Sequence, residues 1–170
     1  MKEYIYPTAC LAAATVFYLL HDRMHAGEAG EEHSHSPVGF IVAFAPMFCH
    51  WAAAVVPQLR FAHHWGWIAA GTIAGLIGAY TGFGAMVMNH KFSDEGGLIT
   101  KGPYRLFRHP MYVGWMLAVV CIALFTRSPV SLIYLPIPLI IHIRWARMEE
   151  KHLREKFGQE YIDYNRKTLF

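Results

Sequence analysis

The chain has 170 residues, of which 55% are hydrophobic and only 16% charged, with a formal net charge of +3. This composition argues against an ordinary soluble domain, and the long apolar blocks are typical of an integral membrane protein. We therefore expect a single membrane domain over residues 1–170 of all-α class, with no nucleic-acid partner. The three cysteines lie in apolar blocks without metal spacing, so we expect small buried side chains and no disulfide framework.

Two apolar segments come first. Tyr4–Leu20 is about long enough to cross a bilayer, and we favour a retained helix over a cleaved signal peptide because its only preceding basic residue is Lys2. The loop His21–Ser36 has four histidines and three glutamates, whose irregular spacing favours a polar connector over a metal site. Val38–Leu59 is the second predicted span. Its His50 is expected to form an interhelical hydrogen bond, with a substrate-chamber wall as the alternative.

The third predicted span, Trp65–Met88, carries two pairs of glycines spaced four residues apart. This spacing lets helix backbones approach closely, so we expect this helix at the centre of the bundle. A polar loop over 89–109 follows. Two apolar runs, Met111–Thr126 and Val130–Ile143, then flank a short turn and predict a helical hairpin.

The second arm of this hairpin contains Pro136 and Pro138, which should bend it. The helix is expected to continue out of the membrane as far as Glu150. In the tail, an apolar face recurs at three- and four-residue steps and predicts an amphipathic helix that Gly158 interrupts. The residues of that face are Leu153, Phe157, Tyr161 and Tyr164. The sequence thus predicts a polytopic helix bundle of about five transmembrane segments.

The basic residues predict the orientation of the chain. Of 15 lysines and arginines, four lie in 89–109 and seven in 144–170. A hairpin between these stretches places both on one side, which the positive-inside rule makes cytoplasmic. We therefore expect the functional site on the cytoplasmic side of a multi-pass protein.

The segment Lys101–Trp115, KGPYRLFRHPMYVGW, organises this side. A turn at Gly102–Pro103 should bring the basic side chains and His109 to the membrane surface. Pro110 suits the first turn of the next helix, where its missing N–H costs nothing. The second arm is expected to bring further charged residues beside this motif: Arg144, Arg147, Glu149 and Glu150. Such a surface fits either a zwitterionic cofactor or anionic lipid headgroups, and the residues alone do not decide between them.

Several motifs of the second half share their order and spacing with one known family. They are LITKGPY at Leu98–Tyr104, RHPMYVGW at Arg108–Trp115, the pair Glu149–Glu150, and FG at Phe157–Gly158. In these the chain resembles the isoprenylcysteine carboxyl methyltransferase family of integral membrane enzymes. The resemblance implies S-adenosylmethionine as cofactor, N-terminal spans in 1–88 and a cofactor-binding catalytic half in 89–170. It implies these cofactor-binding residues: Asn89, Leu98, Ile99, Tyr104, His109, Pro110, Met111, Tyr112 and Glu149.

The resemblance also implies a lipophilic acceptor, prenylated or small, that enters from the bilayer lipids. Arg144, or as second choice Arg147, would hold its carboxylate. An amine acceptor, as in related phospholipid N-methyltransferases, would need a base such as Glu150 or His109. A thiol acceptor is a further alternative, and a non-enzymatic lipid- or partner-binding protein is the alternative of another class. The chain departs from the family at Trp145, where an arginine is common, and in its last residues.

Overall fold

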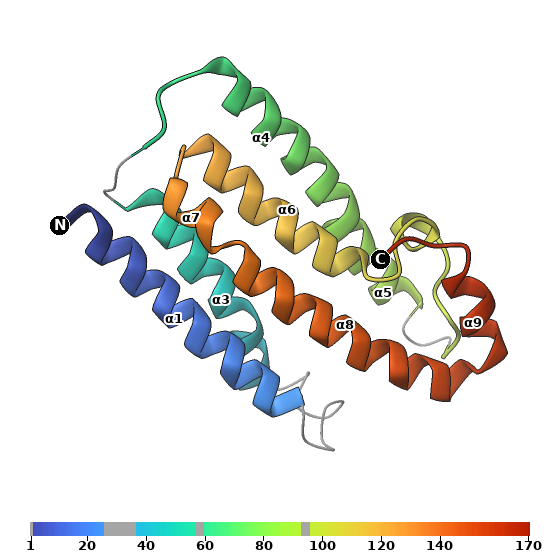
Figure 1. Cartoon of the computed structure of the whole chain (residues 1–170). Helices are drawn as coiled ribbons and strands as arrows, with labels where there is room; N and C mark the ends of the chain where they lie inside the picture. The colour runs from blue at the N-terminus through green and yellow to red at the C-terminus, as the bar shows by residue number, and fades with distance from the viewer. Residues whose placement is uncertain (1, 26–36, 57–59, 93–95) are drawn as a thin grey trace. The chain divides into compact units, whose positions relative to one another are not determined.

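The computed structural model describes residues 2–25, 37–56, 60–92 and 96–170, and the regular elements within these ranges are helices (Figure 1). They are α1 (Lys2–His25), α3 (Pro37–Val55), α4 (Trp65–Gly78), the π-helical turn η1 (Ala79–Phe83), α5 (Gly84–Phe92), the 3-10 helix η3 (Gly102–Arg105), α6 (Pro110–Phe125), α7 (Pro129–Tyr134), α8 (Pro136–Phe157) and α9 (Gln159–Asn165). The predicted all-α class is confirmed. The first loop was predicted to begin at His21, but α1 continues to His25, so this boundary is corrected. The rest of the predicted loop, residues 26–36, lies outside the described residues.

Three helical stretches of the described chain are long and apolar enough to cross a membrane. They are Tyr4–Arg23, Trp65–Phe92 and Pro129–Phe157. Two further apolar helices, Phe44–Val55 and Pro110–Phe125, are shorter. These helices indicate an integral membrane protein, whereas the count of about five spans stays a prediction.

The chain divides into two compact units, and the first comprises residues 1–71 and 119–141. In this unit α1 packs against α3, and both contact α7. Leu11, Ala53 and Tyr134 form its core, against which Cys10 and Val130 pack. Between membrane helices such a contact is stabilised by close van der Waals packing and by hydrogen bonds such as that between Thr15 and Tyr134. All three cysteines of the chain are free and partly buried.

His50 on α3 lies against α7. Its side chain is fully buried, and its ring stands edge-on to the ring of Tyr134 at 5.2 Å between centroids. Neither ring nitrogen lies in good hydrogen-bonding geometry with a described residue. The imidazole nevertheless interacts with the backbone of Ser131 on α7, so the expected interhelical hydrogen bond of His50 stays a prediction. The Tyr134 hydroxyl beside it is bonded to Thr15 and to the Leu11 carbonyl.

The second unit comprises residues 72–118 and 142–170 and contains the close helix approach that the glycines predict. A Cβ placed on Gly114 of α6 would lie 2.4 Å from the N and Cα atoms of Gly82 in η1. One placed on Gly78 would meet the Leu117 side chain at 3.0 Å. Small residues at both surfaces therefore allow the backbones to touch, as the sequence predicted for the 65–88 helix.

The predicted hairpin is present, with a difference in its second arm. The Ser128 side chain caps α7 by accepting a hydrogen bond from the Ser131 amide, as a helix N-cap does. The arm is interrupted at Leu135, between α7 and α8, directly before the first of the two prolines. A proline removes an amide donor and disfavours helical geometry in the residue before it, which accounts for the break. Beyond it α8 continues through Glu150, as predicted.

Candidate functional site

The motif turn lies within the second unit. Gly102 has a φ of +59°, a conformation that glycine adopts at no steric cost, and it begins η3. Pro103 is buried beside Gly84 of α5, where an added Cβ would lie 2.9 Å from the proline ring. Pro110 is the first residue of α6 and is fully buried. Both the turn and the helix start therefore follow the sequence prediction.

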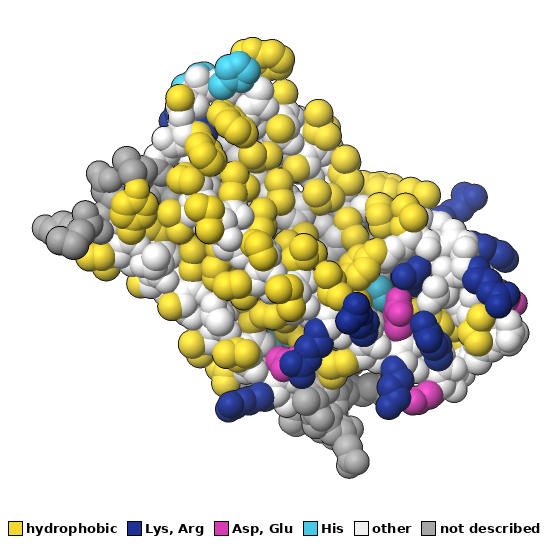
Figure 2. Space-filling model, in the orientation of Figure 1, with side chains coloured by type: hydrophobic (Ala, Val, Ile, Leu, Met, Phe, Trp, Pro, Cys, Tyr) yellow, Lys and Arg dark blue, Asp and Glu magenta, His cyan; other side chains and the backbone are white. Residues whose placement is uncertain are grey.

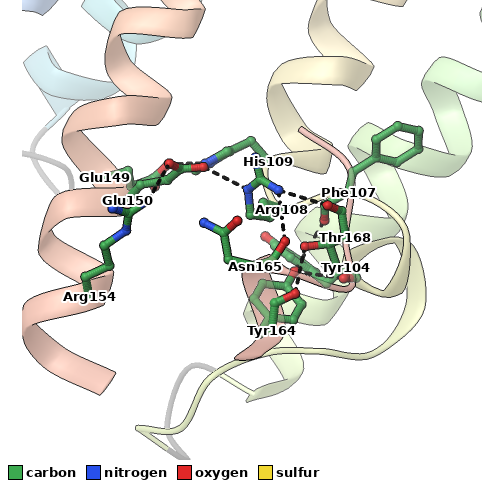
Figure 3. A network of polar contacts seen from close by, with 10 residues as sticks. All are labelled: Tyr104, Phe107, Arg108, His109, Glu149, Glu150, Arg154, Tyr164, Asn165 and Thr168. Atoms are coloured by element: carbon green, nitrogen blue, oxygen red, sulfur yellow. Dashed lines mark hydrogen bonds and ion pairs between the residues drawn. The ribbon is translucent and has the colours of Figure 1, made fainter. Parts of the chain in front are cut away.

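His109 lies between two carboxylates of α8 (Figure 3). Its Nδ1 atom is 3.1 Å from Oε2 of Glu149, within hydrogen-bonding distance. Its Nε2 atom is 3.5 Å from Oε1 of Glu150, an ion-pair distance without a hydrogen bond. The His109 side chain is only 3% exposed, whereas that of Glu149 is 52% exposed. Glu149 can thus orient the imidazole and still present an oxygen to a ligand.

Arg108 holds three parts of the second unit together. Its Nε donates to Glu150 Oε1 at 2.8 Å, and its Nη1 donates to the carbonyls of Thr168 at 2.9 Å and Asn165 at 3.3 Å (Figure 3). Glu150 also lies 3.6 Å from Arg154. Charge-assisted hydrogen bonds of this kind are stronger than neutral ones. Arg108 therefore fixes α8 and the tail relative to the motif turn.

The tail returns across the motif as a short extended segment. The Leu169 amide donates to the Leu106 carbonyl at 2.7 Å, and the Arg108 amide donates to the carbonyls of Leu169 and Phe170 at 2.9 and 3.0 Å. The Phe170 ring then lies 5.7 Å from the His109 ring. This pairing covers the imidazole on one side.

Tyr104, Asn89 and Met111 form a second polar contact. The Tyr104 hydroxyl donates to Asn89 Oδ1 at 2.9 Å, and Asn89 Nδ2 lies 3.3 Å from the Met111 sulfur. Asn89 is on α5 and not in a loop as predicted, because that helix continues one turn beyond the apolar segment to Phe92. Three of the predicted residues, which are far apart in the chain, are thereby brought together.

Burial changes the acidity of the tyrosines around this network. It raises the pKa of Tyr104 to about 12; the hydrogen bond with Asn89 opposes this rise and the charge of Glu149 adds to it. Burial, followed by the charge of Glu150, raises the pKa of Tyr161 to about 12. Both phenols therefore stay protonated at neutral pH, and Tyr104 acts as a donor toward Asn89.

An aromatic layer adjoins His109. Tyr112 of α6 stacks on the imidazole at 5.7 Å and lies 5.3 Å from the His142 ring and 6.3 Å from the Trp145 ring of α8. Trp145, at the position where an arginine is common in the resembled family, is 7% exposed and serves as packing. Predicted residues Tyr112 and His109 thus share one water-poor wall.

Four further predicted residues line hollows or are exposed on α8. Leu98 and Ile99 line a separate small pocket of about 70 Å³ together with Phe92 and Lys101. Arg144 and Arg147 are exposed on α8. Arg147 and Glu150 line an open hollow of about 410 Å³, which Lys151, Arg154 and Glu155 complete.

The candidate site also contains residues that the sequence analysis did not select. Arg108 belonged to the motif, but nothing in the sequence indicated that it bonds tail carbonyls. His142 lies within an apolar run, which hides it, although its position three residues before Trp145 places both on one helix face. Phe170 carries no local signal, because its position depends on backbone pairing between distant segments.

A model of the phospholipid methyltransferase family matches residues 67–160, more than half of the chain. The chain belongs to the phospholipid methyltransferase family. The matched segment contains both His109 and the two carboxylates that face it. The family match therefore covers most of the residues drawn in Figure 3.

Several curated relatives are methyltransferases by name. The chain is 32% identical to protein-S-isoprenylcysteine O-methyltransferase of Homo sapiens over 96 residues, 56% of this chain and 34% of that protein. For the proteins of the same name in Dictyostelium discoideum and Saccharomyces cerevisiae the identities are 28% over 153 residues and 31% over 113 residues. These matches cover 78% and 58% of this chain.

The chain spans 34%, 60% and 45% of the length of these three relatives, in the same order. The matches confirm the resemblance to the isoprenylcysteine carboxyl methyltransferase family. No solved structure matches the chain significantly.

Proposed function

We propose that the chain transfers a methyl group from S-adenosylmethionine to a lipophilic acceptor in the membrane, with an isoprenylcysteine-like carboxylate as the acceptor group. The observation that carries this proposal is the meeting of His109, in the motif turn, with Glu149 of α8 at 3.1 Å. The names of the curated relatives support both the reaction and the acceptor. The active site is proposed to face the cytoplasm, on the basis of the charge distribution.

The residues present fit such a cofactor by the chemistry of their donor set. Glu149 offers a half-exposed carboxylate for hydroxyl or amino groups, and Asn89 offers an amide beside the protonated Tyr104 phenol. The stacked rings of Tyr112 and His109 would form an aromatic wall beside the positively charged sulfonium, since aromatic faces attract cationic groups. Bound there, the cofactor would supply an electrophilic methyl group on a sulfonium sulfur, which leaves as a neutral thioether.

The side chains of the protein then have two tasks, which are orientation and exclusion of water. Glu149 fixes the His109 ring, and Tyr112 and Phe170 cover it. A carboxylate acceptor needs no general base, so correct positioning in a water-poor site can account for the catalysis. We propose that Arg144, or else Arg147, holds the acceptor carboxylate with two parallel hydrogen bonds.

An amine acceptor of phospholipid type is the second candidate, and the family match favours it. It would require a base, and the candidates are Glu150 and His109. Glu150, however, accepts a hydrogen bond from Arg108 and lies 3.6 Å from Arg154. An amine acceptor would have to displace these contacts to use Glu150, and the side chain of His109, the other possible base, is only 3% exposed. The geometry therefore favours the carboxylate.

Transfer of a labelled methyl group tests the proposal directly. The purified full chain would be incubated with labelled S-adenosylmethionine and a panel of prenylcysteines, prenylcysteine methyl esters and phosphatidylethanolamine. Labelling of free prenylcysteines but not of their esters is expected. Labelling of phosphatidylethanolamine instead would select the second candidate, and no labelled product from any acceptor would contradict both.

The roles of His109 and Arg144 can be separated by substitution. His109→Ala should weaken cofactor binding by about 1–3 kcal/mol, because a buried hydrogen-bond partner of Glu149 is lost. Arg144→Ala should leave cofactor affinity nearly unchanged and slow the single turnover, because the acceptor is no longer held in line. If Arg144→Ala lost cofactor affinity while His109→Ala lost only turnover, the two roles would be reversed. If Arg144→Ala had normal cofactor affinity and turnover while Arg147→Ala turned over slowly, Arg147 would be the residue that holds the acceptor.

A further inference from the structure

α8 carries four cationic side chains along one side, directly after its apolar part. Arg144, Arg147, Lys151 and Arg154 are spaced three, four and three residues apart, and all four are exposed. At 3.6 residues per turn they fall within an arc of roughly 80° and along roughly 15 Å of the helix. Figure 2 shows Lys and Arg side chains gathered over this half of α8. We call these four residues the basic stripe.

The basic stripe points away from the interior of the second unit. On the other side of α8, His142, Trp145 and Ala146 are 4%, 7% and 1% exposed. Packing of the unit therefore uses that buried side. Exposed cations on the opposite side contribute little to stability, so their alignment calls for another explanation.

The hollow of about 410 Å³ on α8 has a surplus of positive charge. Three cations of the basic stripe line it, with the carboxylates of Glu150 and Glu155. Glu150 is already bonded to Arg108 at 2.8 Å. Within the described residues neither Arg147 nor Lys151 forms an ion pair. An anion in the hollow would therefore meet cations whose charge is not neutralised.

The position of the basic stripe along α8 indicates which kind of anion it meets. The eight residues before it, Pro136–Ile143, are uncharged, and the whole helical stretch Pro129–Phe157 is a candidate membrane span. A headgroup layer is roughly 5–8 Å thick on each side of the hydrocarbon core, a rise of about three to five helical residues. Arg144 and Arg147 thus fall at this depth, and the flexible Lys151 stem can reach back to it.

We propose that the basic stripe binds the phosphate groups of anionic phospholipids at the surface where α8 leaves the bilayer. The ligand is a resident lipid, and the proposal does not depend on methyl transfer. Arg144 and Arg147 are also candidates for holding an acceptor, so the test measures lipid binding and not turnover. Long basic side chains at such a boundary attract anionic headgroups by about 1 kcal/mol each.

Native mass spectrometry of the detergent-purified full chain, titrated with phosphatidylglycerol or phosphatidylcholine of the same acyl chains, tests this. The wild type should bind phosphatidylglycerol more tightly. Arg147→Gln/Lys151→Gln should weaken that binding about thirtyfold, the product of two cation losses. Arg105→Gln/Lys156→Gln, which removes the same charge from exposed residues outside the stripe, should bind like the wild type.

Three results would overturn the proposal. Equal binding of phosphatidylcholine would mean that the headgroup charge is not recognised. An equal loss in the control variant would mean that only net charge matters. Displacement of phosphatidylglycerol by excess inorganic phosphate would assign the stripe to a soluble anion instead of a lipid. Binding that withstands phosphate supports the lipid.

Discussion

Replacement of Arg108 by glutamine gives the sharpest test of how the site is assembled. The substitution removes the donor to Glu150 and both donors to the tail carbonyls of Asn165 and Thr168. Among the described residues it leaves Glu150 within ion-pair distance of His109, at 3.5 Å, and of Arg154, at 3.6 Å. We therefore expect the tail to detach from the motif turn before the rest of the second unit unfolds.

The magnitude follows from burial and charge. The side chains of Arg108 and Glu150 are 18% and 16% exposed, so this ion pair is largely shielded from water. Loss of one partner of a buried pair costs about 3–5 kcal/mol, and the remaining exposure places the expected loss near the lower end, at about 3 kcal/mol. For a chain of this size that corresponds to a fall in Tm of roughly 6–12 °C.

Thermal unfolding in detergent and limited proteolysis of the tail measure the effect. Arg105→Gln is the matched control, because Arg105 is an exposed residue of the same turn and loses the same charge. It should shift Tm by less than about 2 °C, as surface substitutions usually do. Equal shifts in the two variants, or a tail that is cleaved no faster in Arg108→Gln, would refute the role of Arg108 in holding the tail to the motif turn.

Three further outcomes are expected. Gly114→Ala should destabilise the protein by about 1–3 kcal/mol in thermal unfolding, because its Cβ would lie 2.4 Å from backbone atoms of Gly82. Gly97→Ala is the control and should be neutral, because its Cβ would meet nothing within 4 Å. Tyr104→Phe should reduce the loss of stability at alkaline pH. Because the pKa of Tyr104 is raised from its ordinary value of 10.0 to about 12, the phenol contributes its full stabilisation below pH 10.0 and loses it as the pH rises through about 12. Alkaline unfolding curves of both proteins would show it, and identical curves would count against a buried phenol. Glu149→Gln should weaken cofactor binding in calorimetry more than Glu155→Gln, and equal effects would mean that the pocket lies elsewhere.

The sequence predicted the helices well because their signal is local. Apolar blocks and glycine spacing depend only on neighbours along the chain, so the spans and the close approach of Gly78 and Gly82 could be expected. Their contact on α6, at Gly114 and Leu117, could not, because a lone glycine in an apolar run carries no partner information. The bend was expected at Pro136 and Pro138, and the helix breaks at Leu135. The rule that a proline restricts the residue before it predicts this position.

The candidate site was predictable only in part. The motif spacing placed His109 and Glu149 in one site, and the structure brings them within hydrogen-bonding distance. The return of the tail across Leu106–Arg108 was not predictable, because backbone pairing of this kind uses groups that every residue has. His50 was predictable only as a buried group of a span, because its neighbours, the Tyr134 ring and the Ser131 backbone, depend on how the helices pack.

The central claim is that the second unit holds S-adenosylmethionine through its motif residues, and calorimetric titration of the detergent-purified full chain with this cofactor tests it most directly. Saturable binding of one cofactor per chain is expected, weakened in both His109→Ala and Glu149→Gln. No heat and no thermal shift at millimolar cofactor would contradict the account, as would full affinity in both variants.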